Sequence, residues 1–188
     1  MSPIVQQLMT LLGVLIGAGA TFTATSFTER SKWRRSQHIR WDERRLTAYT
    51  EYANALKRYV QVGYRMAATK GYPTGAEPID LDAGGQALIE ANGERSVRWE
   101  TVLLLGSPAA VRAGRAWHQT AWKYSWSVRE QRIDRAEYLR LYEELGQKRD
   151  AFYACVRADL GVTSGDLPSG DQVWLPPAAS AGGSDTRD

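Results

Sequence analysis

The sequence predicts an all-α protein, in which an N-terminal transmembrane helix continues into an up-down four-helix bundle with a disordered C-terminal tail. Three observations predict this fold class. The first 28 residues contain no Asp, Glu, Lys or Arg, and apolar residues in later segments recur at helical spacing. No segment alternates apolar and polar residues as a half-buried strand does. The predicted divisions are an anchor at residues 1–28, a cytoplasmic bundle at 29–161 and a tail at 162–188.

The first predicted element is a membrane span from Ile4 to Phe27. A hydrocarbon core about 30 Å thick requires about 20 mostly apolar residues in a helix, and this run supplies them. A cleaved secretory signal is the alternative, because Ala18-Gly19-Ala20 has the small-x-small form of a cleavage site. No basic residue precedes the apolar run, whereas a secretory signal begins with one. The sequence therefore favours the uncleaved anchor.

Positive charge is concentrated directly after the predicted span. Seven Lys or Arg lie between residues 29 and 45, and none precedes them. Because such charge stays on the cytoplasmic side, we expect a single-pass plasma-membrane protein with its N-terminus outside and its C-terminus in the cytoplasm. Five of these residues are candidate contacts for lipid headgroups, with a merely solvated helix as the alternative. They are Arg30, Lys32, Arg34, Arg35 and Arg40.

Small residues follow one side of the predicted span at spacings of three and four. They are Thr10, Gly13, Gly17, Ala20 and Ala24. Close approach of backbones drives helix association in bilayers, so this groove predicts a homodimer through the transmembrane helix. A helix of another protein is the alternative occupant.

The first bundle helix is expected to continue from the membrane to about residue 70, because neither Gly nor Pro occurs between Gly19 and Gly63. Turn residues from Lys70 to Gly75 end it. Its predicted core positions are Tyr49, Ala53, Leu56, Val60, Gly63 and Ala67. A second helix is predicted from about Leu81 to Leu105. Its predicted inward face carries Leu88, Arg95, Trp99 and Val102.

The remaining two helices have clear starting signals. Ser107 is a candidate cap with Pro108 in the first helical position, and this helix is expected to reach about Glu130. Asp134 and Glu137 form a possible capping box for the last helix. Gly161 is a candidate C-terminal cap. The predicted core positions of the last helix are Tyr138, Leu141, Leu145, Phe152, Val156 and Leu160.

The helix predicted after Pro108 contains an unusual set of aromatic residues. Its apolar centre consists of Ala110, Gly114, Ala121 and Ser125. Trp117 and Tyr124 lie on one flank, and Trp122 and Trp126 lie on the other. In one interpretation these residues form a wide core face. In the other, Trp122 and Trp126 bind a partner protein, because tryptophan is enriched at interface hot spots.

Searches for catalytic, cofactor and metal motifs find none. The only histidines, His38 and His118, lack the Glu-x-x-His spacing of di-iron bundles, and His118 is interpreted as a core-edge residue. Cys155 is the only cysteine, which excludes an intramolecular disulfide, and it is interpreted as a buried hydrophobe. Residues 29–60 carry nine basic and four acidic residues, and the rest of the chain has a net charge of −2. Charge concentrated beside the membrane argues against a nucleic-acid partner.

Arginine outnumbers lysine nineteen to five, and Trp41 to Tyr49 reads as a charged cluster followed by Ala-Tyr. In these features the chain resembles single-pass membrane-anchored helical proteins of high-GC Gram-positive bacteria. The resemblance implies a plasma-membrane setting and no activity. It covers about the first 60 residues and transfers no site residue.

The sequence therefore predicts a non-catalytic interaction or scaffold protein at the cytoplasmic membrane face. A membrane-anchored enzyme with an unrecognised site, a regulatory or sensory bundle, and a secreted helical protein with a cleaved signal remain alternatives. In the tail, Val173-Trp174-Leu175 is the single apolar island. Trp174-Leu175-Pro176-Pro177 is either a short docking motif, a lid on the bundle, or incidental.

Overall fold

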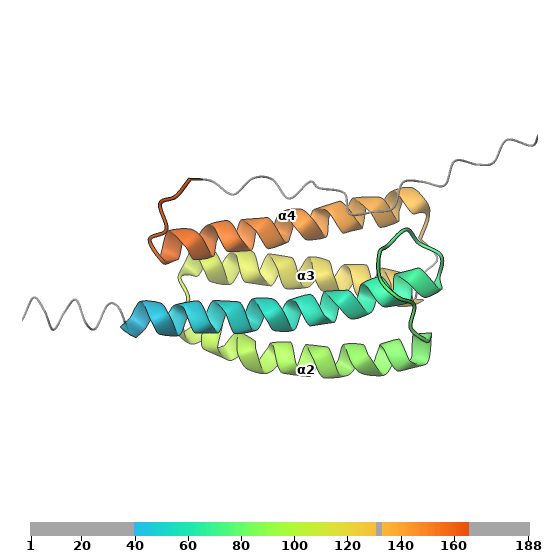
Figure 1. Ribbon diagram of the computed structural model, residues 1–188, viewed down its shortest axis with the longest axis horizontal. Coiled ribbons are helices and arrows are strands. Elements are labelled where there is room, and N and C mark those ends of the chain that lie inside the picture. Colours follow the sequence, from blue (N-terminus) through green and yellow to red (C-terminus); the bar gives the residue numbers. More distant parts are fainter. Residues whose placement is uncertain (1–39, 131–132, 166–188) are drawn as a thin grey trace, which may run out of the picture. The chain divides into compact units, whose positions relative to one another are not determined.

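The computed structural model describes residues 40–130 and 133–165, and every regular element in these ranges is a helix (Figure 1). The N-terminal helix occupies residues 40–69 of the described chain. It is followed by α2 (Leu81–Leu105), α3 (Pro108–Glu130) and α4 (Arg135–Asp159). The predicted helical class is confirmed for these ranges, and the bounds of α2 and α3 agree with the sequence prediction.

Several predicted features lie outside the described residues. They are the span from Ile4 to Phe27 with its small-residue groove, the basic residues 30–35, and the tail from residue 166 onward. Arg40 is described and is exposed. The helices within residues 40–165 include none that is both long and apolar enough to cross a bilayer.

The chain divides into two compact units, residues 1–44 and 45–188. Of the first unit, the structure describes only the helical turn at 40–44. In this turn the Arg44 guanidinium lies over the ring of Trp41, 5.5 Å from its centroid. An arginine over an indole face is a favourable cation–π contact.

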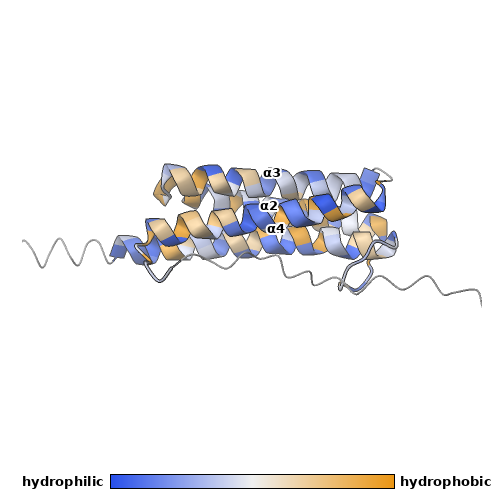
Figure 2. Cartoon of the chain, turned by 90° about the horizontal axis from the view of Figure 1, so that it is seen from above, coloured by the Kyte–Doolittle hydropathy of each residue, from blue (hydrophilic) through white to orange (hydrophobic). Residues whose placement is uncertain are grey.

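In the second unit, four helical segments lie side by side, and each runs opposite to the preceding one (Figure 1). Hydrophobic and hydrophilic residues alternate along each helix, as expected where one face is buried (Figure 2). All six predicted core positions of the N-terminal helix are buried. On α2, Leu88, Arg95 and Val102 are buried and Trp99 is half-buried, which agrees with the predicted inward face.

The helix starts follow the predicted caps. The Ser107 hydroxyl accepts a hydrogen bond from the Ala110 N–H at 3.2 Å. The Asp134 carboxylate accepts one from the Glu137 N–H at 2.8 Å. The Glu137 side chain binds Arg140 and does not return to Asp134, so only half of the expected capping box forms. Arg140 provides a charge-assisted hydrogen bond, which is stronger than a neutral one.

One end of the bundle is held together by the carboxylate of Asp159 at the end of α4. The Tyr49 hydroxyl donates to this carboxylate, and the Ser107 N–H donates to its Oδ2 at 3.3 Å. Arg45 lies 3.9 Å from the same carboxylate and donates to the Leu105 carbonyl at 2.9 Å. Burial, followed by the bond to Asp159, raises the pKa of Tyr49 to about 12. These contacts join all four helices at one point.

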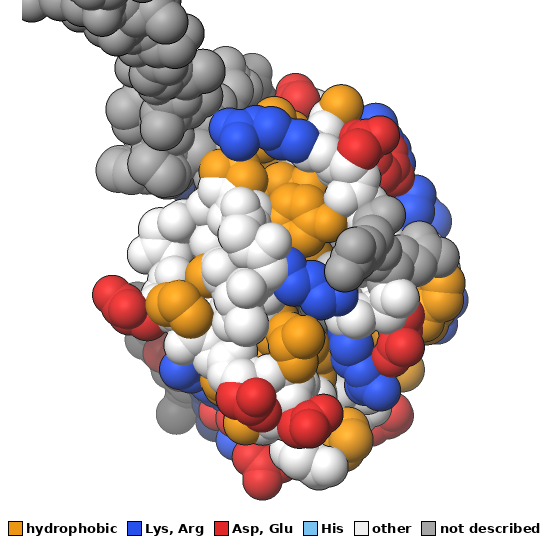
Figure 3. All heavy atoms as spheres, turned by 90° about the vertical axis from the view of Figure 1, so that its right-hand side faces the viewer, with side chains coloured by type: hydrophobic (Ala, Val, Ile, Leu, Met, Phe, Trp, Pro, Cys, Tyr) orange, Lys and Arg blue, Asp and Glu red, His pale blue; other side chains and the backbone are white. Residues whose placement is uncertain are grey.

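The opposite end is closed by tyrosines. The rings of Tyr72 and Tyr138 stack with centroids 4.7 Å apart, and the Tyr138 hydroxyl donates to the Pro73 carbonyl at 2.9 Å. The Lys70 ammonium donates to the Arg129 carbonyl at 2.8 Å, which ties the first loop to the end of α3. Seen from this end, hydrophobic and charged side chains are intermixed (Figure 3).

Gly114 allows the helices to approach closely in the middle of the bundle. A Cβ atom at this position would lie 2.9 Å from the Trp99 ring and 3.3 Å from the Phe152 ring. The Tyr52 hydroxyl donates to the Gly114 carbonyl at 2.8 Å. The N-terminal helix, α2 and α4 therefore all meet α3 at this residue.

We predict that Gly114→Val lowers the free energy of unfolding by about 1–3 kcal/mol, because the side chain overpacks the core. Gly146→Val is the matched control, since a Cβ there has open space around it. The control should be nearly neutral, because valine has slightly better helix propensity than glycine. Denaturant unfolding of the full chain in mild detergent, followed by circular dichroism, measures both. Equal stability of the two variants would contradict the close approach.

Candidate functional site

Trp122 and Trp126 form an exposed, stacked pair on α3. Their side chains are 54% and 42% exposed. The ring centroids are 6.1 Å apart and the ring planes differ by 12°. Trp117 on the same helix is only 2% exposed. The wide-core-face interpretation therefore fits Trp117 and Tyr124 and does not fit Trp122 and Trp126.

The tryptophan pair is the centre of a longer exposed stripe. Its members follow one another at spacings of four, three, four and three residues, which places them on one side of a helix. The stripe consists of Arg115, Gln119, Trp122, Trp126 and Arg129, all exposed. Sequence reasoning identified only the two tryptophans. The spacing was visible in the sequence, but polar residues at helical spacing do not distinguish a binding face from an ordinary solvated one.

The stripe lies on a positively charged helix. From Pro108 to Arg129, α3 has four Lys or Arg and no Asp or Glu. Arg129 pairs with Glu130, the single acidic residue of the helix, at 2.7 Å. Arg112 and Arg115 form no ion pair with any residue in 40–130 or 133–165. The face around the tryptophans therefore carries uncompensated positive charge.

A buried arginine on α2 lies next to α3. Arg95 is 7% exposed and donates to the Asn92 side-chain oxygen and the Ser96 hydroxyl, each at 3.2 Å. Both acceptors are neutral, and no carboxylate of the described chain pairs with this guanidinium. A buried charge without a counter-ion is costly, and this charge acts on His118 of α3, whose pKa it helps to lower.

His118, one turn before Trp122, is held in its neutral form. Burial is the main cause, and the nearby Arg95 charge adds to it, so the pKa of His118 falls to about 4. Its Nε2 atom is buried and has no hydrogen-bond partner in the described structure. The expectation of a core-edge histidine agrees with this placement. A neutral imidazole adds no charge of either sign to the tryptophan stripe.

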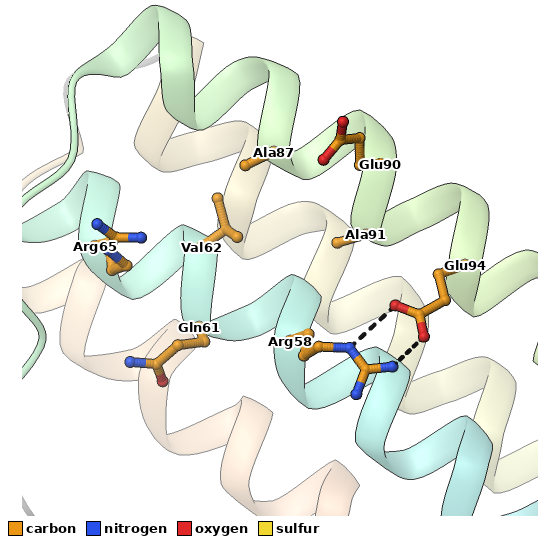
Figure 4. Close-up of a pocket in the computed structure, with 8 residues that line it drawn as sticks. All are labelled: Arg58, Gln61, Val62, Arg65, Ala87, Glu90, Ala91 and Glu94. Carbon is orange, nitrogen blue, oxygen red and sulfur yellow. Dashed lines mark hydrogen bonds and ion pairs between the residues drawn. The ribbon is translucent and has the colours of Figure 1, made fainter.

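A shallow surface hollow lies between the N-terminal helix and α2, and Figure 4 shows its lining. The Arg58 guanidinium crosses it to Glu94, with Nε 3.0 Å from the carboxylate. The Glu90 carboxylate points away from that of Glu94 (Figure 4). The two carboxylates do not converge on a common point, as acid–base catalysis would require. Among the residues described, no cluster of His, Cys, Asp or Glu could hold a metal ion.

The remaining candidates have ordinary structural roles. Cys155 is half-buried against the core, so it is less enclosed than expected. Glu143 and Glu144 are adjacent on α4 and bind different neighbours: Glu143 accepts a hydrogen bond from Gln147, and Glu144 accepts one from Arg140. The predicted headgroup contacts before Arg40 and the predicted transmembrane packing residues lie outside the described residues.

No protein-family model, curated protein or solved structure matches this chain.

We predict that the lowered pKa of His118 makes stability depend on pH. Above the ordinary value of 6.5 the imidazole is neutral in both states, and stability is complete. As pH falls from 6.5 toward about 4, the unfolded chain binds a proton that the folded chain does not, so the free energy of unfolding falls. Denaturant unfolding at several pH values in this range measures the slope.

His118→Gln should flatten the slope between these two pH values, whereas His38→Gln, which removes the other histidine, should leave the contribution of His118 intact. A proton NMR titration of the full chain gives the pKa directly. Titration of His118 near its ordinary pKa would show that its side chain is solvated and would contradict the prediction.

Proposed function

We propose that this chain is a non-catalytic interaction protein, held at the cytoplasmic face of the plasma membrane by its N-terminal helix. We propose further that the tryptophan stripe of α3 binds a partner protein. The observation that carries the proposal is the exposure of two stacked indoles in a helix whose third tryptophan is buried. Tryptophan and arginine are the residues most enriched at binding hot spots, and the stripe combines both.

The isolated bundle leaves the rings of Trp122 and Trp126 in contact with water. Covering a large aromatic side chain contributes about 1.5–3 kcal/mol. Stacking has already restricted the motion of Trp122 and Trp126, so a partner meets a surface that loses little entropy on binding. The positive residues around the pair favour a partner surface of negative charge, which would also speed association.

The described residues also support a binding role over a catalytic one. Glu94 is held in its ion pair with Arg58, and His118 is neutral and partly enclosed. The hollow beside Arg58 has no pair of converging carboxylates. Acid–base catalysis by two carboxylates requires both to act on one substrate.

The membrane part of the proposal comes from the sequence. The uncharged run from Ile4 to Phe27 would form the span, and Arg30, Lys32, Arg34, Arg35 and Arg40 would contact anionic headgroups. The Gly13-x-x-x-Gly17 groove would pair two anchors.

A two-hybrid assay of the isolated span in a membrane tests this pairing. A signal that Gly13→Ile and Gly17→Ile leave unchanged would rule out the homodimer.

We predict that a reporter fused after Asp188 behaves as cytoplasmic, because seven basic residues follow the span and none precedes it. A green fluorescent fusion should fluoresce, and an alkaline phosphatase fusion should be inactive. Phosphatase activity would show that the bundle lies outside the cytoplasm. It would equally fit the cleaved-signal alternative, which the mass of the mature chain would then decide.

We predict that a photo-crosslinking residue at position 122 or 126 of the full chain, in living cells, captures discrete partner proteins. The same residue at position 147, exposed on α4, is the matched control and should capture none of them. Trp126→Ala should reduce recovery of the captured partner by at least about tenfold, because hot-spot tryptophans contribute that much.

Trp41→Ala, which removes another exposed tryptophan, is the control substitution and should leave recovery unchanged. Adducts that are the same from positions 122, 126 and 147 would contradict the proposed binding face. Recovery that falls equally for Trp41→Ala and Trp126→Ala would show that tryptophan contacts in general, rather than this stripe, hold the partner.

A further inference from the structure

We propose that the C-terminal segment around Trp174 binds across the tryptophan stripe of α3 and competes with the partner for it. The proposal deepens the proposed function, because it assumes that this stripe is the partner-binding face. The proposed occupant of the stripe is the segment of residues 166–177 of the same chain, and four features of the chain support this assignment.

The first feature is charge. From Val162 to Ser184 the chain contains Asp166 and Asp171 and no Lys or Arg. The stripe offers the opposite charge, because Arg115 has no ion pair in the described chain and α3 has no acidic residue before Glu130. Opposite charges at partly enclosed positions attract over several ångströms. The charge of the segment is therefore opposite to the charge of α3.

The second feature is reach. The Asp159 carboxylate at the end of α4 lies 3.3 Å from the Ser107 N–H, so the tail begins beside the start of α3. Trp122 is 14 residues along that helix from Pro108, a rise of about 21 Å. Leu160 and Trp174 are also 14 residues apart, and an extended chain of that length spans up to about 46 Å. The segment can reach the tryptophans and still pass around the side of α3.

The third feature is the order of the groups. Moving along α3 from its start, Arg115 comes seven residues before Trp122, a rise of about 10 Å. In the tail, Asp171 comes three residues before Trp174, an extended distance of about 10 Å. A tail that runs parallel to α3 therefore places Asp171 at Arg115 when Trp174 is at the stacked indoles.

The fourth feature is the type of apolar group. Trp174 and Leu175 are followed by Pro176 and Pro177, which favour the extended polyproline conformation. Proline-rich segments bind exposed aromatic surfaces and lose little entropy because they are already extended. Two parallel indoles provide such a surface.

Binding within one chain would regulate access to the stripe. A segment attached by a short connection has an effective concentration in the millimolar range. A weak contact of the tail would therefore occupy the stripe in the absence of a partner. A tighter partner would displace it, so the tail sets a threshold for partner binding.

The test uses the full chain in detergent, with Gln119 replaced by p-benzoylphenylalanine so that both tryptophans remain. Gln119 lies in the stripe between Arg115 and Trp122 and is exposed, and the same replacement at Gln147 on α4 is the matched control. We expect cross-links from position 119 to peptides of residues 166–188, and none from position 147.

Trp174→Ala should reduce the yield of these cross-links by about tenfold, as for a lost aromatic anchor. Asp171→Asn should reduce it less, and added salt should weaken the wild type more than this variant.

Mixing nitrogen-15-labelled and unlabelled chains distinguishes the source of the segment. If the α3 peptide and the tail peptide in each cross-link carry the same isotope, the tail binds within its own chain. Cross-links between a labelled and an unlabelled peptide would show that the tail of a second copy binds the stripe, and would overturn the proposal. Cross-links to detergent alone, equal yields from positions 119 and 147, or no effect of Trp174→Ala would also overturn it. Partner capture from position 126 in cells without tail cross-links would leave the proposed function standing and remove only this inference. Tail cross-links without any partner would remove the proposed function and the competition, and would leave only the contact between the tail and the stripe.

Discussion

The contact between Asp159 and the elements around it determines how the four helices meet. Tyr49, Arg45 and the Ser107 N–H all converge on this carboxylate at one end of the bundle. Gly106 makes the convergence possible, because a Cβ there would lie 2.7 Å from the Val102 carbonyl and 3.1 Å from the Tyr49 hydroxyl. Since α3 starts at this point, these contacts hold its first turn in place. Further along α3, Trp117 is buried and Trp122 and Trp126 are exposed.

Small residues on the inner face of α3 reinforce this orientation. A Cβ at Gly63 would lie 2.9 Å from the Ser125 hydroxyl oxygen, so the N-terminal helix and α3 nearly touch there. A Cβ at Gly114 would meet Trp99 and Phe152 in the same way. The space beside Gly114 is filled by the rings of Trp99 and Phe152, as expected for a closely packed interior. Gly114 and Ser125 thus lie on the inner face of α3, whereas Trp122 and Trp126 are exposed.

Local signals in the sequence predicted the helices well. Contacts between residues far apart in the chain could not be predicted from these signals. Ser107 with Pro108, and Asp134, marked helix starts because caps act within one turn. The spacing of residues such as Leu56 and Val102 predicted burial, since one face of each helix must be inside. A single helix projection gives angles but not the positions of neighbouring helices, so the exposure of Trp122 stayed open. The Asp159 contacts join residues far apart in sequence, and no motif encodes them.

The chemistry of the stripe also limits what can displace the tail. Arg95 is buried without a carboxylate, His118 is neutral, and Arg115 forms no ion pair with any described residue, so the charge of Arg115 is left without a counter-ion. A competitor that lacked negative charge would leave Arg115 unpaired, and one without an aromatic or proline-rich anchor would leave the indoles in water. A successful partner must therefore carry an acidic group about 10 Å from an apolar anchor, the distance between Arg115 and Trp122 along the helix. Because the tail has the same two groups at that spacing, partner and tail exclude each other through shared chemistry, and no change in the bundle is required.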